Sequence, residues 1–164
     1  MADRVFIDTN VLVYADDVNG GAKRKRAIEV LSTQVSEERA VISTQILQEY
    51  FAVATRKLGL TAEDARRRVE VLRTLDIVVV KPELILRAID LHRLHSISFW
   101  DALVVACAKA AACGTILTED LNHGQIIDGI VISNPFVEPT RAGEPRARYI
   151  PRRSRARQGL GAPR

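Results

Sequence analysis

Short, continuous apolar runs alternate along the chain with longer segments in which apolar residues recur every three or four positions. Continuous runs are typical of strands that are buried on both faces, and the helical spacing is typical of amphipathic helices. We expect strands at 4–8, 40–43, 77–80, 115–118 and 129–133. We expect helices at 23–35, 44–57 and 99–112, with two more that begin near 61 and 82.

The order of these elements predicts an α/β fold. Strands that alternate with helices favour a three-layer α/β/α sandwich, with a mostly parallel central sheet covered by helices on both faces. Ser98 precedes the most hydrophobic helix of the chain and is expected to cap it.

Charge divides the chain into two parts. The 164 residues include 24 basic and 20 acidic side chains, a formal net charge of +4. Residues 138–164 hold eight of the basic and two of the acidic ones, which leaves 16 and 18 in residues 1–137. We therefore expect a mildly acidic domain at 1–137 and a basic, disordered tail at 138–164 that could tether RNA non-specifically.

The sequence predicts a cytoplasmic protein without a membrane partner. Its N-terminus lacks the apolar core of a secretory signal, and no apolar run reaches the length of a membrane span. Cys107 and Cys113 lie six residues apart in an alanine-rich segment. In a helix that spacing is about 9 Å, which is too far for a disulfide, so we expect two buried, reduced thiols.

Four acidic residues lie in unexpectedly apolar surroundings: Asp8, Glu49, Asp101 and Asp120. Each has a structural explanation, such as a helix cap, a turn or an exposed helix face. However, Asp8 and Asp120 both follow predicted strands, and Asp101 lies in the first turn of a helix. Ligands of parallel α/β sheets bind beyond the carboxyl ends of the strands, so we expect these acids to share one crevice.

Clustered carboxylates repel one another and raise each other's pKa, and a divalent cation relieves that repulsion. Ligands that are all oxygen atoms, without a cysteine or histidine cluster, favour Mg²⁺ or Mn²⁺ over zinc. Such a site supports hydrolysis of a phosphodiester by a metal-activated water.

Residues 4–137 resemble the PIN-domain family, and specifically the VapC-type toxin ribonucleases of type II toxin–antitoxin systems. The segments that carry the resemblance are D-T-N at 8–10, S-T-Q-I-L-Q-E at 43–49, S-F-W-D-A-L at 98–103, L-T-E-D-L-N-H-G-Q at 117–125 and I-S-N-P-F at 132–136. The resemblance implies a Mg²⁺- or Mn²⁺-dependent endoribonuclease that cuts single-stranded or loop regions of RNA. It also implies a homodimer and a cognate antitoxin.

The family's acidic site maps onto the same four acids. We expect Asp8 and Asp101 to be the main metal ligands, and Glu49 and Asp120 to complete the site partly through waters. One of the four is expected to take the proton of the attacking water. Asn10 and Thr118 are expected to orient the carboxylates.

An apolar groove beside the site would hold the antitoxin, and its expected wall is Val11, Leu12, Tyr14, Tyr50, Phe51 and Ala54. The alternative is that some of these residues pack in the core. The basic run K-R-K-R at 23–26 is either an RNA contact or a solvated helix start. We expect His92, His95 and His123 to be structural, and Trp100 to pack in the core or at a dimer contact.

Two other functions remain open at this stage. The first is an RNA- or protein-binding module whose acids are structural. The second is a phosphatase of the haloacid-dehalogenase type, which requires an acid at position 10, where this chain has Asn10.

Overall fold

The computed structural model describes residues 3–137, and the tail expected at 138–164 lies outside them. Its elements are, in chain order, β1 (Arg4–Ile7), α1 (Thr9–Asp16), α2 (Gly21–Ser36), β2 (Ala40–Ser43), α3 (Thr44–Arg56), α4 (Ala62–Leu72), β3 (Asp76–Val78), α5 (Pro82–His95), α6 (Phe99–Ala110), β4 (Cys113–Leu117), β5 (Ile126–Ile127) and β6 (Ile130–Ser133).

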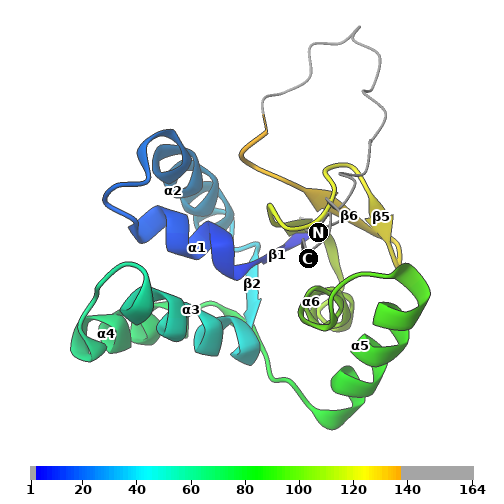
Figure 1. Ribbon diagram of the computed structural model, residues 1–164. Helices are drawn as coiled ribbons and strands as arrows, with labels where there is room; N and C mark the ends of the chain where they lie inside the picture. Colours follow the sequence, from blue (N-terminus) through cyan, green and yellow to red (C-terminus); the bar gives the residue numbers. More distant parts are fainter. Residues whose placement is uncertain (1–2, 138–164) are drawn as a thin grey trace, which may run out of the picture.

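The strands form one sheet in the order β3-β2-β1-β4-β6-β5, and only β5 runs antiparallel to its neighbour. Helices α1 and α2 lie on one side of β1 and β2, and α5 and α6 lie on the other (Figure 1). The predicted α/β fold with a mostly parallel central sheet is therefore confirmed. No helix within residues 3–137 is long and apolar enough to cross a membrane.

The carboxyl ends of β2, β1 and β4 meet at one edge of the sheet. These three strands are neighbours and run parallel, with Ile7 in register with Leu117. The peptide N–H of Asp8 extends this pairing by donating to the Leu117 carbonyl at 3.0 Å. The residues that follow the three strands are therefore brought together, and they include Asp8 after β1 and Asp120 after β4.

The core is built on the sheet and includes buried residues of each helix from α1 to α6. Helix α6 buries an unbroken run from Ala102 to Ala108, and the inward residues of β1, β2, β4 and β6 are fully buried. The thiols of Cys107 and Cys113 are buried and unbridged as expected, although the two residues do not share a helix: Cys107 lies in α6 and Cys113 begins β4.

Two elements were not expected from the sequence. Helix α1 has only eight residues and is apolar on most of its surface, so it lacks the alternation that reveals an amphipathic helix. The expected strand at 129–133 is preceded by the two-residue strand β5, with which it forms a hairpin. Asp128 and Gly129 turn this hairpin with φ angles of 51° and 80°. An Asp-Gly pair is the usual signal for such a turn.

The prediction of an exposed apolar groove wall is wrong for four of its six residues. Val11, Leu12, Tyr50 and Ala54 are buried in the core, where they hold α1 and α3 together. Phe51 is 40% exposed and, with Leu47 and Val69, lines an apolar hollow of about 560 Å³ between α3 and α4.

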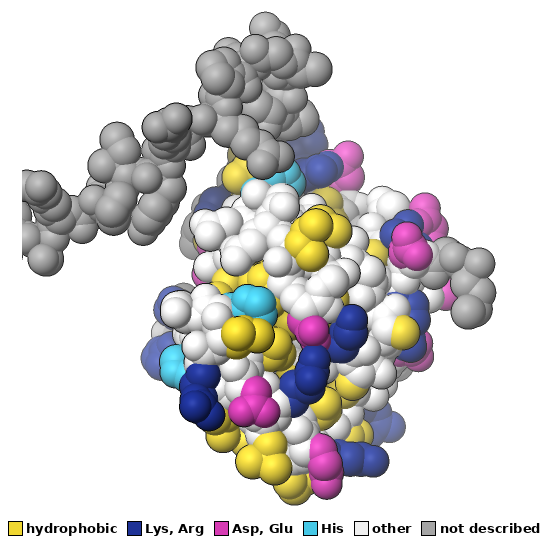
Figure 2. Space-filling view, turned by 90° about the vertical axis from the view of Figure 1, so that its right-hand side faces the viewer, with side chains coloured by type: hydrophobic (Ala, Val, Ile, Leu, Met, Phe, Trp, Pro, Cys, Tyr) yellow, Lys and Arg dark blue, Asp and Glu magenta, His cyan; other side chains and the backbone are white. Residues whose placement is uncertain are grey.

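Trp100 does not pack in the core, because 60% of its surface is exposed and its ring packs edge-on against Phe99. Other large apolar side chains are exposed on α5, among them Leu86 and Leu94. Figure 2 shows the α5 side of the molecule, where hydrophobic side chains are interspersed with charged ones of both signs.

Candidate metal centre

Asp8 is the most buried acid of the site. It ends β1 and caps α1, and its Oδ1 accepts a hydrogen bond from the peptide N–H of Thr9 at 2.7 Å. Only 6% of its surface is exposed. Burial raises its pKa to about 7, although the hydrogen bonds from Thr118 and Thr9 oppose the rise. A carboxylate held in this way gains from a neighbouring cation that would compensate its charge.

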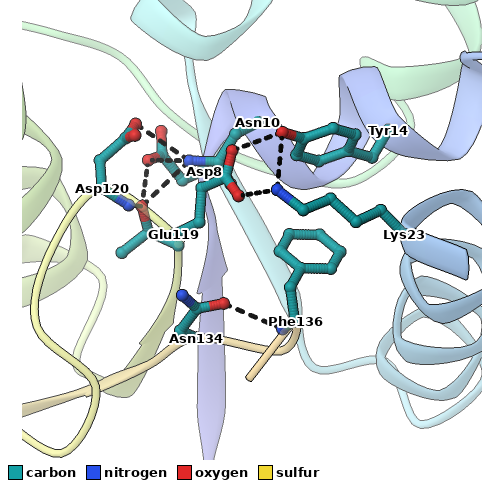
Figure 3. Close-up of polar contacts among 9 residues, drawn as sticks. Asp8, Asn10, Tyr14, Lys23, Glu119, Asp120, Asn134 and Phe136 are labelled. Carbon is teal, nitrogen blue, oxygen red and sulfur yellow. Dashed lines mark hydrogen bonds and ion pairs between the residues drawn. The ribbon is translucent and has the colours of Figure 1, made fainter. Parts of the chain in front are cut away.

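Asn10 and Thr118 connect Asp8 to Asp120. The Thr118 hydroxyl donates to Oδ2 of Asp8 at 2.6 Å and accepts from the peptide N–H of Asp120 at 3.1 Å. The Asn10 amide donates to Asp8 at 3.1 Å and to Asp120 at 3.0 Å. The residues expected to orient the carboxylates therefore contact both strand-end acids, and Figure 3 shows Asn10 between Asp8 and Asp120.

Glu49 joins the same cluster from α3. The Thr9 hydroxyl donates to one of its carboxylate oxygens at 2.7 Å, and the Gln45 amide donates to the other at 2.8 Å. Thr9 and Gln45 were not singled out from the sequence. Gln45 lies one helical turn before Glu49, a spacing that favours side-chain contact, and Thr9 lies next to Asp8 in the chain.

Asp101 lies in a capping box. The Ser98 hydroxyl accepts from the peptide N–H of Asp101 at 3.0 Å and donates to its carboxylate at 2.6 Å. Asp101 therefore does have the helix-capping role that is the structural alternative for this acid. That role does not account for the other charges near its carboxylate. Burial raises the pKa of Asp101, and the charges of Asp120 and Glu49 raise it further.

Two of the acids act on the other two. The negative charges of Asp120 and Glu49 raise the pKa of Asp8 and that of Asp101. The expected mutual increase in pKa is found for these two acids. For both, however, burial is the larger cause.

The donor atoms fit a hard divalent cation. All four acids offer carboxylate oxygens, and the Asn10 side-chain carbonyl oxygen is buried without a hydrogen-bond partner. Within residues 3–137, no group of three or more Asp, Glu, His or Cys side chains is already arranged to hold a metal ion. Mg²⁺ keeps several waters and is commonly bound through one or two carboxylates, so it does not require such a cage.

The centre opens into a cleft of about 570 Å³ between α1 and α3. Its lining includes Thr9 and Asn10 and six charged residues: Asp17, Glu49, Arg56, Lys57, Glu119 and Asp120. A ligand in this cleft would therefore reach the carboxylates from the solvent.

Beside Asp120, a second polar cluster is formed by Glu119, Tyr14 and Lys23 (Figure 3). The Tyr14 hydroxyl and the Lys23 ammonium each donate to the Glu119 carboxylate at 2.6 Å. Lys23 also donates to the Tyr14 oxygen at 3.0 Å, and Phe136 packs edge-on against the Tyr14 ring. We call these residues the Glu119 brace, because they tie the loop that carries Asp120 to α1 and α2.

The remaining candidates are placed as follows. Lys23 belongs to the brace, and Arg26 pairs with Glu29 and the Pro135 carbonyl, so half of the basic run at 23–26 is engaged within the fold. His92 contacts the Ile97 carbonyl, and His123 accepts from the peptide N–H of Asn134 at 3.1 Å. Both contacts stabilise loops.

The fold and these residues define a class: a parallel α/β domain with an acidic centre at the carboxyl edge of its sheet. Residues 5–127 match the PIN domain family, and the match covers well over half of the chain. The chain therefore belongs to the PIN domain family. Comparison with curated proteins gives no significant match.

Solved structures share the fold at low sequence identity. A toxin–antitoxin complex from Klebsiella pneumoniae superposes with a TM-score of 0.60 at 21% identity, over 80% of this chain and 98% of that one. DNA-bound VapBC from Salmonella typhimurium gives 0.60 at 18%, over 80% and 98%. VapC20 of Mycobacterium tuberculosis, described as a toxin that cleaves the sarcin–ricin loop, gives 0.57 at 17%, over 68% and 86%.

Proposed function

We propose that this protein is a divalent-metal-dependent endoribonuclease, the toxin of a toxin–antitoxin pair. The observation that carries the proposal is the grouping of four acids at the carboxyl edge of the sheet: Asp120 and Glu49 line an open cleft, and their charges act on both Asp8 and Asp101. Membership of the PIN domain family and the fold shared with solved toxin structures support it.

The four acids would hold Mg²⁺ or Mn²⁺, with Asp8 and Asp101 as the main ligands. A bound ion would supply an activated water and stabilise negative charge on the reacting phosphate. Asn10 and Thr118 hold the Asp8 and Asp120 carboxylates, and Thr9 and Gln45 hold Glu49. One of the four acids takes the proton of the attacking water, and the ribose oxygen leaves as the phosphorus–oxygen bond breaks.

An antitoxin protein is the proposed partner. The similar structures from Klebsiella pneumoniae and Salmonella typhimurium are those of a toxin–antitoxin complex and of a DNA-bound VapBC complex, and each covers 80% of this chain. The sequence expectation of a homodimer stays a prediction, as does the cytoplasmic location.

Cleavage assays with matched variants test the proposal. The wild-type protein should cut a single-stranded RNA in Mg²⁺ or Mn²⁺ and stop when EDTA is added. Asp8→Asn and Asp101→Asn should each lower the rate by at least about a hundredfold, since each removes a charge that the ion needs. Asp90→Asn, an isosteric change at an exposed acid of α5, should leave the rate unchanged.

Two results would contradict this function. Wild-type cleavage rates in either site variant would show that these acids do not hold the catalytic ion. Tight RNA binding by the wild-type protein, with no cleavage under any divalent ion, would instead favour a binding module whose acids are structural.

A further inference from the structure

The cleft between α1 and α3 is lined by charges of both signs. Glu49 and Asp120 lie beside the candidate metal centre, and Arg56 and Lys57 lie farther along α3; Asp17, which caps the C-terminus of α1, is a further acid of the lining. Both basic side chains are exposed, and neither forms an ion pair within residues 3–137. Their charges are therefore available to a ligand that occupies the cleft.

Helical geometry fixes the distance between Glu49 and Arg56. Arg56 follows Glu49 by seven residues on α3, which is two turns along the same helix face, or about 10 Å. Ala52 and Val53 lie on that face between them, and Val13 of α1 completes the apolar wall. Along α3, a ligand in the cleft would thus meet the Glu49 carboxylate, then an apolar surface, then two cations, whose combined charge exceeds that of the single Asp17 carboxylate from α1.

The other basic run near the centre is less suited to the same task. Lys23 is bound to Glu119, and Arg26 is bound to Glu29 and the Pro135 carbonyl. Arg24 and Lys25 are exposed and do not line the cleft. Of the two groups, Arg56 and Lys57 are therefore the pair that faces the space in front of the acids.

We propose that Arg56 and Lys57 form a phosphate-binding subsite for the single strand that flanks the scissile bond. The proposal rests on the proposed ribonuclease function. An acidic centre repels a polyanion, so a ribonuclease needs cations beside the acids to retain the strand. The aliphatic wall between the acids and the cations gives an unpaired base an apolar surface to pack on.

A purely structural explanation also exists for these two residues. They lie at the C-terminal end of α3, where cations compensate the helix dipole. That role predicts a change in stability without a change in RNA binding, so the two explanations are separable.

The test compares two double variants of the full-length protein. Arg56→Gln/Lys57→Gln removes the proposed subsite, and Arg24→Gln/Lys25→Gln removes the same charge from α2. Binding of a fluorescein-labelled oligouridylate of about 12 nucleotides is measured in EDTA over a range of salt concentrations. Thermal unfolding and Mn²⁺ affinity are measured for both variants and the wild type.

The subsite variant should bind the oligonucleotide about tenfold more weakly at low salt. The slope of log affinity against log salt should fall by about 1.4, which corresponds to two phosphate contacts on a single strand. The α2 variant should lose much less oligonucleotide affinity and much less salt slope. The Mn²⁺ affinity of both variants should equal that of the wild type. In Mg²⁺, the subsite variant should raise KM while kcat stays within about twofold.

An unchanged salt slope in the subsite variant, or equal losses in both double variants, would overturn the subsite. Because binding is measured without metal, its outcome does not depend on catalysis. If the subsite variant loses salt slope but the wild-type protein cuts no RNA, the ribonuclease proposal fails, and Arg56 and Lys57 still bind phosphate.

Discussion

At the scale of single residues, the burial of the Asp8 carboxylate has the clearest energetic consequence. Its carboxylate is buried at the end of an apolar strand, and three side chains or peptide groups hydrogen-bond to it. Burying a charge without a compensating partner is costly, and its pKa is raised to about 7 as a result. The residue is therefore destabilising in its ionised form unless a cation is bound beside it.

This environment predicts how stability depends on pH when metal is absent. The folded-state pKa of Asp8 lies above the value of 3.8 expected in the unfolded chain. The folded state thus binds more protons between these two values, and the stability that Asp8 contributes falls as pH rises from about 4 to about 7. In EDTA, the wild-type protein should lose several degrees of melting temperature relative to Asp8→Asn between pH 5 and pH 8.

Thermal melts of both proteins across that range check the prediction. Groups outside the acidic cluster titrate equally in the two proteins, so the difference between them reports on Asp8 and the acids that interact with it. A difference that is constant with pH, or that grows in favour of the wild type at high pH, would show that Asp8 is not a strained carboxylate.

At the scale of elements, the loop after β4 is held from two directions. Asn10 of α1 donates to Asp120 itself, and the Glu119 brace ties the preceding residue to α1 and α2. Glu119 is the more buried partner of its ion pair, with 23% of its side chain exposed against 46% for Lys23. The brace therefore fixes the position of a carboxylate that would otherwise lie on a free loop.

A double-mutant cycle measures the brace. We expect Lys23→Met and Glu119→Gln to show a coupling energy of about 1 kcal/mol in urea unfolding, because the pair is partly buried and shares the Tyr14 hydroxyl. The control cycle is Arg66–Glu70, an exposed pair one turn apart on α4, for which about 0.3–0.5 kcal/mol is typical. Equal coupling in the two cycles would mean that the brace is an ordinary surface ion pair.

At the scale of the whole molecule, the sequence predicts most of the architecture because parallel strands are buried on both faces and so appear as continuous apolar runs. The same property identifies the acids, since a carboxylate at the end of such a run is conspicuous. Helix α1 was missed because its eight residues are mostly apolar and show no alternation. Four of the six groove residues were misplaced for a related reason, since apolar residues beyond one helix face can still be buried between two helices.

The contacts that support the site were the hardest to predict. Thr9 bonds to Glu49 across 40 residues of sequence, and Lys23 bonds to Glu119 across 96. No local pattern specifies such pairs, since the sheet order brings their elements together. Asn10 and Thr118 were found because each lies two residues or fewer from a strand-end acid.

The most direct test of the central claim is the anomalous scattering of a crystal soaked in Mn²⁺. We predict a peak at the mouth of the cleft, within coordination distance of carboxylate oxygens of Asp8 and Asp101, and no such peak in an Asp8→Asn crystal. If the wild-type protein cuts RNA in Mn²⁺ but its soaked crystal shows no peak among the four carboxylates, these acids do not hold the catalytic ion.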